Sequence, residues 1–336
     1  MKPTDFAQAL TTYLSSYLPG QKNASLHTVQ SYRDTFKLLL RYCQCVRGLA
    51  IERLSLSDID DQLIIGFLEW LETKRHNQIA TRNQRLACIH AFYRYLQTED
   101  PAGLWLYQKI LALPMKKTPR PVIAHLTPAA LQVLLAQPDR ATRSGRRDAT
   151  LLAVLYDTGA RVQELLDLRV RDIRLAPPPL LTLTGKGNKT RQVPLMSPTT
   201  KLLGRYLDEW HLERNGTQDC PVFFNRRRQK MTRAGVAFIL EKYATQARRH
   251  STDIPEHVTP HALRHSKAMH LLQSGVNLIY IRDLMGHTDI ATTEIYARAD
   301  TELKRKALEQ VYPSLISDEL PDWTKDDALL EWLSRF

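Results

Sequence analysis

The sequence lacks the features by which membrane and secreted proteins are recognised. It has no apolar run of about 18 residues or more, so no membrane-spanning helix is expected. Its first residues, MKPTDFAQALTTYL, lack the apolar stretch of a secretory signal. These two absences predict a cytoplasmic protein with no membrane partner.

Cysteine is also scarce. The 336 residues contain four cysteines, and none has the paired CxxC spacing of a zinc or redox site. They are Cys43, Cys45, Cys88 and Cys220. We expect reduced thiols that bind no metal.

Acidic residues are outnumbered by basic ones. Lys and Arg total 47 against 35 Asp and Glu, a formal net charge of +12. The excess lies mainly in residues 114–312, whereas residues 313–336 are acidic. A concentrated basic region predicts a polyanionic partner, and nucleic acid is the usual one. Charge alone leaves open a basic protein without such a partner.

The first third of the sequence has the apolar periodicity of helices. Helices are expected over residues 25–44, 58–73 and 81–97, the first of them capped by Ser25. Helices of this kind pack as a small bundle. On the third helix, Arg82, Arg85 and Arg94 are expected on the side that faces solvent.

A proline-rich segment separates this region from the rest. The four prolines of LALPMKKTPRPVIAHLTP forbid a continuous helix. We expect a helical domain over 1–113, a linker over 114–124 and a second domain over 125–312. Lys116, Lys117 and Arg120 make the linker basic, which suits a strap across a phosphate backbone.

The second domain is expected to be mostly helical. Thr127 and Pro128 predict the cap and first turn of its first helix. Residues 180–195, LLTLTGKGNKTRQVPL, alternate about central turn residues and predict a β-hairpin. The predicted fold class is therefore mainly α with a small β-sheet (α+β).

Residues 313–336 are expected to form a separate C-terminal piece. Thr324 can cap a short helix whose first turn holds Asp326 and Asp327. Its apolar face would carry Leu329, Trp332, Leu333 and Phe336. We expect this helix to dock on a neighbouring protomer. Folding back onto its own domain is the alternative.

Six polar residues of the second domain stand in contexts that suggest chemistry. They are Arg161, Lys186, His261, Arg264, His287 and Tyr296, within TGARVQEL, TGKGNKTRQVPL, HALRH and LMGHTDIATTEIYARAD. These motifs make residues 125–312 similar to the catalytic domain of the tyrosine recombinase (phage integrase) family. The first domain resembles the family's N-terminal, SAM-like core-binding domain. The resemblance implies an enzyme that cuts and rejoins DNA at specific sites.

Two arginines are the candidates for binding the phosphate oxygens that gain charge in the transition state. A guanidinium binds two oxygens at once and stays protonated, which suits Arg161 and Arg264 to this role. Glu164, three residues after Arg161, is expected to orient that guanidinium from the same helical face. An isolated arginine is usually a solvated cation, and the family pattern reverses this reading.

Lys186 occupies the tip of the predicted hairpin, from which an ammonium can give a proton to the leaving 5′ oxygen. The resemblance implies this role for Lys186, and nearby Lys189 is the alternative. The loop does not match the GxxxxGK[ST] pattern of a nucleotide-binding loop. The cations expected to contact DNA are Arg82, Arg85, Lys116, Lys117, Arg120, Lys189 and Arg191.

His261 and Arg264 are three residues apart on one predicted helix, so both can face one phosphate. His261 and His265 have the spacing of zinc ligands, but Ala262 stands where a zincin needs glutamate, so no metal is expected. His287 is expected to hydrogen-bond the scissile phosphate, although a lone histidine is more often structural.

Tyr296, nine residues after His287, is the candidate nucleophile. A phenol has an unperturbed pKa of about 10, so its attack at neutral pH needs a nearby base or cations. The resemblance implies a 3′-phosphotyrosine intermediate and a free 5′ hydroxyl. A 5′ hydroxyl from a second duplex then reseals the DNA, with no cofactor and no metal.

The resemblance also implies partners. They are double-stranded DNA, three further copies of the chain in a homotetramer on two duplexes, and accessory DNA-bending or directionality proteins. The location implied is the bacterial cytoplasm, on the nucleoid when bound to DNA. The stretch AMHLLQSGVNLIYIRDLMGH resembles integrases and transposases of mobile elements more than chromosome-dimer resolvases.

Two other functions are compatible with parts of this pattern. A type IB topoisomerase uses the same chemistry but reseals the same strand. A DNA-binding accessory protein with an inactive site is the non-enzymatic alternative. All six candidate positions are filled, and loss of one charge-stabilising donor alone costs about 10²–10³ in rate. An intact set therefore favours an active enzyme.

Overall fold

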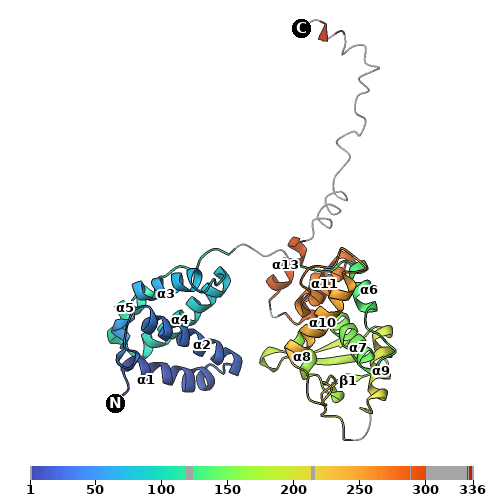
Figure 1. Cartoon of the computed structure of the whole chain (residues 1–336), viewed down its shortest axis with the longest axis horizontal. Coiled ribbons are helices and arrows are strands. Elements are labelled where there is room, and N and C mark those ends of the chain that lie inside the picture. Colours follow the sequence, from blue (N-terminus) through green and yellow to red (C-terminus); the bar gives the residue numbers. More distant parts are fainter. Residues whose placement is uncertain are drawn as a thin grey trace. The chain divides into compact units, whose positions relative to one another are not determined.

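The computed structural model describes residues 2–118, 124–212, 216–287 and 289–299, with Glu331, Leu333 and Ser334 near the C-terminus. The chain divides into two compact units, Met1–Pro121 and Val122–Phe336 (Figure 1). The division falls inside the linker that the prolines predict. The domain limits proposed from the sequence otherwise stay a prediction.

The N-terminal unit is a bundle of helices. Its elements are α1 Asp5–Thr12, the π-helix η1 Tyr13–Gln21, α2 Leu26–Cys45, the short 3-10 helices η2 Ile51–Arg53, η3 Leu56–Asp58 and η4 Pro101–Gly103, α3 Asp61–Thr73, α4 Ile79–Glu99 and α5 Leu104–Leu111. The helix α4 contacts α2, α3 and α5. Phe92 of α4 has no exposed surface, and its ring packs edge to face against Phe36 with 5.0 Å between the ring centroids. The core of this unit therefore forms around α4.

Capping residues explain where these helices begin. Ser25 Oγ accepts from Thr28 N (3.3 Å), and α2 begins at the next residue, as predicted. The helix α3 begins at Asp61, three residues later than predicted. The reason is local, because Asp60 Oδ1 caps it through Leu63 N (2.7 Å).

The side chain of Arg82 is buried, so the prediction that it faces solvent is wrong. Arg82 is 7% exposed, and its Nη1 donates to Pro114 O (3.2 Å). Asn83 Nδ2 donates to Lys116 O (2.7 Å), which holds the chain after α5 against α4. This returning segment covers the side of α4 that the helical pattern left open. Lys116 itself is exposed but pairs with Glu72 (2.8 Å).

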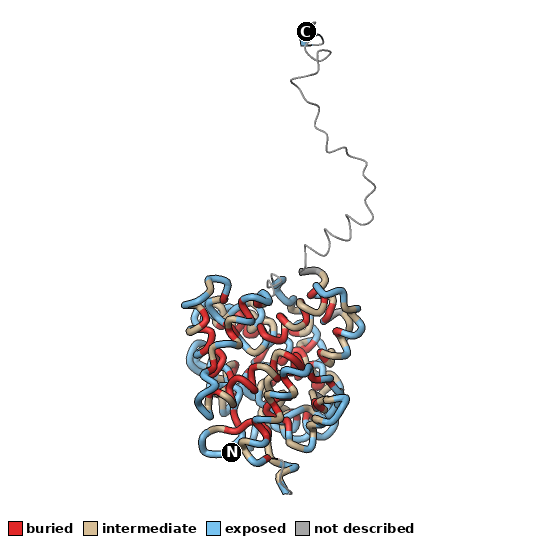
Figure 2. Tube along the Cα trace, turned by 90° about the vertical axis from the view of Figure 1, so that its right-hand side faces the viewer, coloured by how far each residue is buried: buried red, intermediate tan, exposed pale blue. Residues whose placement is uncertain are grey.

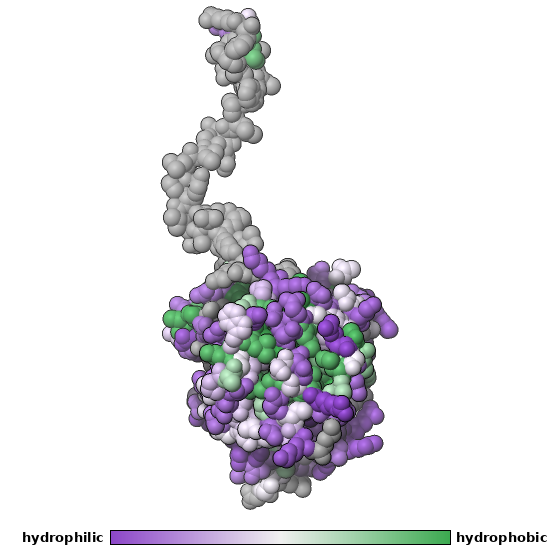
Figure 3. Space-filling model, turned by 90° about the vertical axis from the view of Figure 1, so that its left-hand side faces the viewer, coloured by the Kyte–Doolittle hydropathy of each residue, from purple (hydrophilic) through white to green (hydrophobic). Residues whose placement is uncertain are grey.

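Arg85 is also engaged within the bundle. It is half-buried, and its Nη1 donates to Ser31 O (3.2 Å) and Thr35 Oγ1 (3.0 Å) of α2. Arg94 and Lys117 are exposed. On the face of this unit seen in Figure 3, hydrophilic side chains surround a central area where hydrophobic ones gather. Among the cations predicted from the linker, Arg120 lies outside the described residues.

The described part of the second unit combines helices with one small sheet. Its described elements are α6 Pro128–Ala136, α7 Arg143–Thr158, α8 Val162–Asp167, η5 Val170–Asp172, β1 Ile173–Arg174, β2 Leu180–Thr184, η6 Lys186–Asn188, β3 Thr190–Pro194, α9 Ser197–Glu209, α10 Arg233–Ala247, α11 Pro260–Gln273, α12 Leu278–Met285 and α13 Ala291–Ala299. The helix α7 contacts α6, α9 and α11. Buried residues, red in Figure 2, alternate with exposed ones along these helices.

The sheet contains the predicted hairpin and one further strand. Strands β2 and β3 pair antiparallel, with Leu181 opposite Val193, and both side chains are fully buried. The additional strand β1 pairs with β2 and has two residues, too few to show an alternating pattern. The mainly α fold with a small sheet is confirmed.

Among the described helices, none has both the length and the apolar character needed to cross a bilayer. The predicted C-terminal helix falls largely on residues that the structure does not describe. Thr324, Asp326, Asp327, Leu329, Trp332 and Phe336 all lie outside the described residues.

Candidate active site

Arg161 lies at the junction of α7 and α8. The helix α7 ends at Gly159, which has a left-handed backbone (φ 57°), and Arg161 is the N-cap residue of α8. Its backbone N–H donates to Glu164 Oε2 (2.9 Å), and its Nη1 donates to Oε1 (2.8 Å). One carboxylate thus caps the helix and holds the guanidinium, from the i,i+3 position that the sequence indicates.

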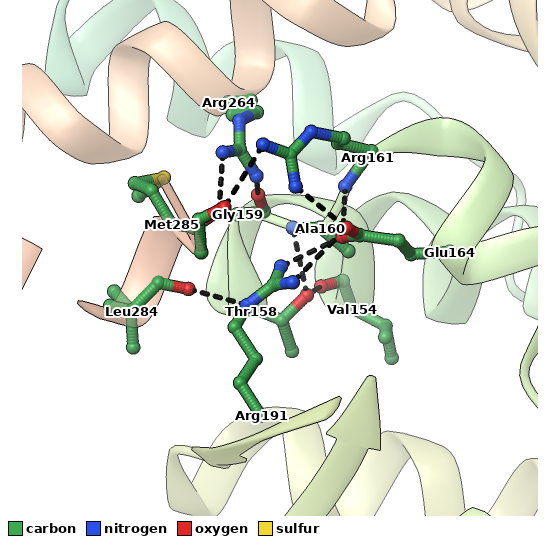
Figure 4. Close-up of polar contacts among 11 residues, drawn as sticks. Val154, Thr158, Gly159, Ala160, Arg161, Glu164, Arg191, Arg264, Leu284 and Met285 are labelled. Atoms are coloured by element: carbon green, nitrogen blue, oxygen red, sulfur yellow. Dashed lines mark hydrogen bonds and ion pairs between the residues drawn. The ribbon is translucent and has the colours of Figure 1, made fainter. Parts of the chain in front are cut away.

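The C-terminal end of α12 collects three guanidinium groups (Figure 4). The pairs are Arg191 Nε with Leu284 O (2.8 Å), Arg264 Nη2 with Met285 O (2.5 Å) and Arg161 Nη2 with Gly286 O (3.1 Å). Carbonyls at a helix C-terminus have no intrahelical donor and carry partial negative charge. The end of α12 therefore gathers cations from α8, α11 and β3 at one place.

Gly286 favours this arrangement. Its backbone is left-handed (φ 62°), which ends α12. A Cβ at this position would lie 2.8 Å from Arg191 Nη1. Glycine thus allows both the turn and the close approach of the guanidinium.

Arg264 is held between the ends of two helices. Besides Met285 O, its guanidinium donates through Nη1 to Gly159 O (2.5 Å) at the C-terminus of α7. Arg264 is 3% exposed, and burial together with the nearby charge of Arg161 lowers its pKa to about 10. It therefore stays protonated at neutral pH and is fixed in one orientation.

Glu164 balances part of this positive charge. Burial would raise the pKa of its carboxyl, but hydrogen bonds from Arg191 and Arg161 outweigh burial and hold that pKa at about 2. Arg191 supplies two of these bonds, to Oε1 (3.1 Å) and Oε2 (2.7 Å). The guanidinium of Arg191 is thus engaged by Glu164 and by the end of α12, and its contact with DNA stays a prediction.

His287 follows Gly286 and is half-buried beside α13. Its Nδ1 lies 2.9 Å from the hydroxyl of Thr293, which is fully buried. Burial, then Arg264 and Arg161, lowers the pKa of this imidazole to about 4. His287 is therefore neutral at pH 7 and is oriented by Thr293.

His261 is exposed on the first turn of α11, where Thr259 Oγ1 caps the helix through Ala262 N (3.2 Å). Partial desolvation, then Arg264 and Arg161, lowers the pKa of its imidazole. The same two guanidiniums thus act on both predicted histidines. Sequence spacing had indicated this for Arg264, and the fold adds Arg161.

Tyr296 is buried in α13, with 1% of its surface exposed. It packs in a small apolar cluster that includes Met269, Ile281 and Met285. Burial raises the pKa of its phenol, while Arg264 and Arg161 oppose that increase. Its hydroxyl lies 2.9 Å from Nδ1 of His265 on α11.

The predicted lysine lies at the tip of the hairpin. Gly185 N donates to Lys189 O (2.8 Å), and the turn passes through Gly187 and Asn188, both with positive φ. The side chain of Lys186 lies outside the described residues, and Lys189 is exposed. The hairpin and the end of α12 border an open depression of about 680 Å³, lined by Arg161, Lys189, Arg191, Gly286 and His287 among others.

Sequence reasoning missed three features near this site. His265 was considered as a zinc ligand alone, and Thr293 was not singled out; both are recognised through contacts between helices. The turn at Arg226, Arg227 and Arg228 was also missed. These arginines are exposed, and Asn225 Oδ1 fixes the turn by accepting from the backbone N of Arg227 (2.9 Å). In the sequence this turn can be recognised as an asparagine followed by three arginines.

Comparisons with known proteins show the family of this chain. Residues 124–302 match the phage integrase family, and residues 11–100 match the phage integrase N-terminal SAM-like domain. The putative integrase/recombinase y4rC of Sinorhizobium fredii is 36% identical over 334 residues, with 99% of each chain covered. The tyrosine recombinase XerC of Pelobacter propionicus is 30% identical over 308 residues, covering 90% of this chain and 95% of the relative.

Solved structures show the same fold. The XerH site-specific recombinase bound to palindromic difH substrate has a TM-score of 0.69 at 22% identity, covering 87% of this chain and 82% of that chain. The Tn1549 transposon integrase in complex with transposon right end DNA has a TM-score of 0.70 at 15% identity, covering 90% and 99%. The chain described here therefore belongs to the phage integrase family, the tyrosine-type site-specific DNA recombinases.

Proposed function

We propose that this chain recombines DNA by transferring a phosphoryl group directly to Tyr296, without a metal ion. The observation that carries the proposal is the gathering of Arg161 and Arg264 at the end of α12, with His287 and Tyr296 beside them. Two fixed guanidiniums supply the positive charge that a pentavalent phosphate needs. The proposed site thus stabilises the transition state with this chain's own cations.

Arg161 and Arg264 are proposed to hold the non-bridging oxygens. Each guanidinium has five N–H donors, of which its contacts to Glu164 and to helix-end carbonyls use a part. Arg161 keeps 36% of its side chain exposed toward the depression, where a phosphate can reach it. Fixing these groups before DNA binds reduces the cost of ordering them during the reaction.

His287 is proposed to donate a third hydrogen bond to the phosphate. If Thr293 donates its hydroxyl proton to Nδ1, the neutral ring carries its own proton on Nε2. That proton then faces away from Thr293 and is available to a phosphate oxygen. His261 lies three residues before Arg264 and is exposed. It is proposed as a further phosphate contact.

Lys186 is proposed to protonate the 5′ oxygen as it leaves. Its place on a hairpin tip allows an ammonium to follow the DNA strand into the site. Lys189, exposed on the same hairpin and lining the depression, is the second candidate. Separate substitution of each lysine distinguishes the two.

The proposed partner is double-stranded DNA. The net charge of +12 and the exposed cations Lys117, Lys189, Arg227 and Arg228 suit a polyanion. Strand exchange between two duplexes would assemble four copies of the chain, with accessory DNA-bending proteins setting direction. The similarity to an integrase/recombinase and to a transposon integrase supports a role in a mobile element.

The test is a covalent-trapping assay. The binding site is first selected from a random-sequence DNA pool, and nicks are then placed at successive positions beside it so that the cleaved end diffuses away. Wild type in EDTA should form a protein–DNA adduct that survives denaturing electrophoresis, and Tyr296→Phe should form none. Adduct formation by Tyr296→Phe, or a requirement for divalent metal, would contradict the proposal.

A further inference from the structure

The hydroxyl of Tyr296 has one described hydrogen-bond partner, and it is His265. The two atoms, Tyr296 Oη and His265 Nδ1, are 2.9 Å apart, and the ring centroids are 5.6 Å apart. Tyr296 is almost fully buried and His265 is half-buried, so the contact is partly shielded from water. Such shielding strengthens a hydrogen bond and favours direct proton transfer between its partners.

His265 is better placed for this contact than the two other histidines nearest to Tyr296, His261 and His287. His261 lies one turn earlier, its side chain is exposed, and its ring centroid is 6.3 Å from that of His265. His287 stacks near the phenol at 6.4 Å between centroids, but its Nδ1 is engaged with Thr293. Among the described histidines, His265 is therefore the one whose nitrogen meets the reacting oxygen.

We propose that His265 is the general base that removes the proton from Tyr296 as it attacks. This inference rests on the proposed function of Tyr296 as nucleophile. The proton moves from Oη to Nδ1 of His265 while Oη bonds to phosphorus. The bond from phosphorus to the 5′ oxygen breaks, its electron pair leaves with that oxygen, and Lys186 supplies the oxygen with a proton. Resealing reverses each transfer, so His265 returns the proton to the departing phenol.

The surroundings of His265 keep its ring neutral, as a base must be. The charged and titratable groups that face it are His261 and Arg264 on its own helix, His125 before α6, and Tyr296 on α13. Burial first, and then His261, Arg264 and His125, lower the pKa of His265 below its ordinary value. A neutral ring has one nitrogen without a proton, and a base that accepts from Tyr296 must have Nδ1 as that nitrogen.

The same helix provides an internal reference for this tautomer. His270 Nε2 lies 2.9 Å from the carbonyl oxygen of Leu126, so Nε2 must carry the proton there. Its Nδ1 lies 2.9 Å from the hydroxyl of Tyr156 and therefore accepts. His270 thus repeats the contact proposed for His265 at a distance from the phosphate site.

The first experiment reads the tautomer in the DNA-free full-length chain. Nitrogen-15 NMR of the histidine rings at pH 8 should place Nδ1 of His265 in the unprotonated range, as for Nδ1 of His270. Assignment uses His265→Gln and His270→Gln. A proton on Nδ1 of His265 would overturn the proposal, because that nitrogen could not then accept one from Tyr296.

The second experiment measures cleavage rates against pH for His265→Gln, with His270→Gln as the matched control. At pH 7, His265→Gln should be slowed about 10²-fold, the lower end of what general-base catalysis contributes. The deficit should shrink as pH rises toward the pKa of the phenol, because hydroxide then ionises Tyr296. His270→Gln should stay within about threefold of wild type at every pH, since it lacks the acid–base role.

The outcomes separate this inference from the proposed function. Adduct formation by Tyr296→Phe would show that Tyr296 is not the nucleophile. It would contradict both the proposed function and the role of His265. An adduct that depends on Tyr296 but forms at the wild-type rate with His265→Gln would overturn the base and leave the function intact. An equal deficit at every pH would also overturn it, as that marks a purely positional role. Thermal melting checks folding, and His265→Asn replaces the glutamine variant if that variant does not fold.

Discussion

The residue on which the most contacts of the site converge is a carboxylate, Glu164. It accepts from the backbone and side chain of Arg161 and from two nitrogens of Arg191, while its own side chain is 3% exposed. Breaking a buried ion pair from one side leaves an uncompensated charge. The i,i+3 spacing of Arg161 and Glu164 predicts their contact from the sequence. The contact of Arg191 with Glu164 was not predicted.

We predict that Glu164→Gln lowers the free energy of unfolding by about 3 kcal/mol at pH 7. The folded-state pKa of about 2 lies below the unfolded value, so the carboxylate stabilises the fold above about pH 4.3. That contribution is lost as pH falls toward 2. Urea unfolding at pH 7 and pH 3 measures both effects, and the gap between wild type and variant should narrow at pH 3.

Glu209→Gln is the matched control. Glu209 also pairs with an arginine, Arg146, through two hydrogen bonds of 2.9 and 2.7 Å, but it is 22% exposed. A pair in contact with water contributes about 1 kcal/mol or less. Equal losses of unfolding free energy in the two variants would show that burial does not determine how much the Glu164 network stabilises the fold.

A second prediction at this scale concerns Thr293. Thr293→Val keeps the shape of the side chain but removes the hydroxyl from His287 Nδ1. We expect cleavage to slow about tenfold, because an oriented histidine loses the partner that fixes its tautomer, whereas Thr293→Ser should stay near wild type. Single-turnover cleavage rates measure this, and equal rates for both variants would contradict it.

At the scale of elements, the end of α12 organises the site. Three carbonyls there accept from three guanidiniums that come from different parts of the sequence. The helix begins at Leu278 and ends where Gly286 turns left-handed, so its length sets where those carbonyls lie. Because α12 must end in a left-handed turn at this point, a glycine precedes His287.

We predict that Gly286→Ala disrupts cleavage more than stability. An alanine at positive φ costs about 1 kcal/mol, and its Cβ would also lie 2.8 Å from Arg191 Nη1. Gly275, after α11, has φ 80° with no atom within 4 Å of a Cβ, so Gly275→Ala is the control for strain alone. Both should melt at similar temperatures, while Gly286→Ala alone loses at least about tenfold in cleavage rate. Loss of cleavage in both would assign the effect to strain.

Elements whose signals are local could be predicted from the sequence. Ser25, Thr127 and Thr259 each cap a helix through a backbone N–H three residues on, so the start of each helix is encoded in a few neighbouring residues. The burial of Arg82 could not be predicted, because its cover comes from Pro114, 32 residues away. His265 and Tyr296, 31 residues apart, meet for the same reason.

At the scale of the whole molecule, charge should govern DNA affinity. The turn at Arg226, Arg227 and Arg228 is joined to α8 through Lys230, which pairs with Asp167. The turn is therefore linked to α8, the helix whose N-cap residue is Arg161. Its three arginines were missed from sequence and are exposed.

We predict that replacing these three arginines by glutamine lowers the salt dependence of DNA binding. Each phosphate contact contributes about 0.9 to the slope of log K against log salt, so the slope should fall by up to about 3. Lys230→Gln on the same turn should change it little, because Asp167 already neutralises this lysine. Fluorescence anisotropy across salt concentrations measures both, and an unchanged slope for the triple variant would exclude the turn from the interface.

During the proposed reaction Tyr296 becomes covalently joined to DNA. The most direct measurement is mass spectrometry of the trapped adduct after digestion with nuclease and protease. One nucleotide should be attached through phosphotyrosine to the peptide that contains Tyr296, with the same yield in EDTA. A nucleotide on any other residue, or cleavage that leaves no attached nucleotide, would contradict it.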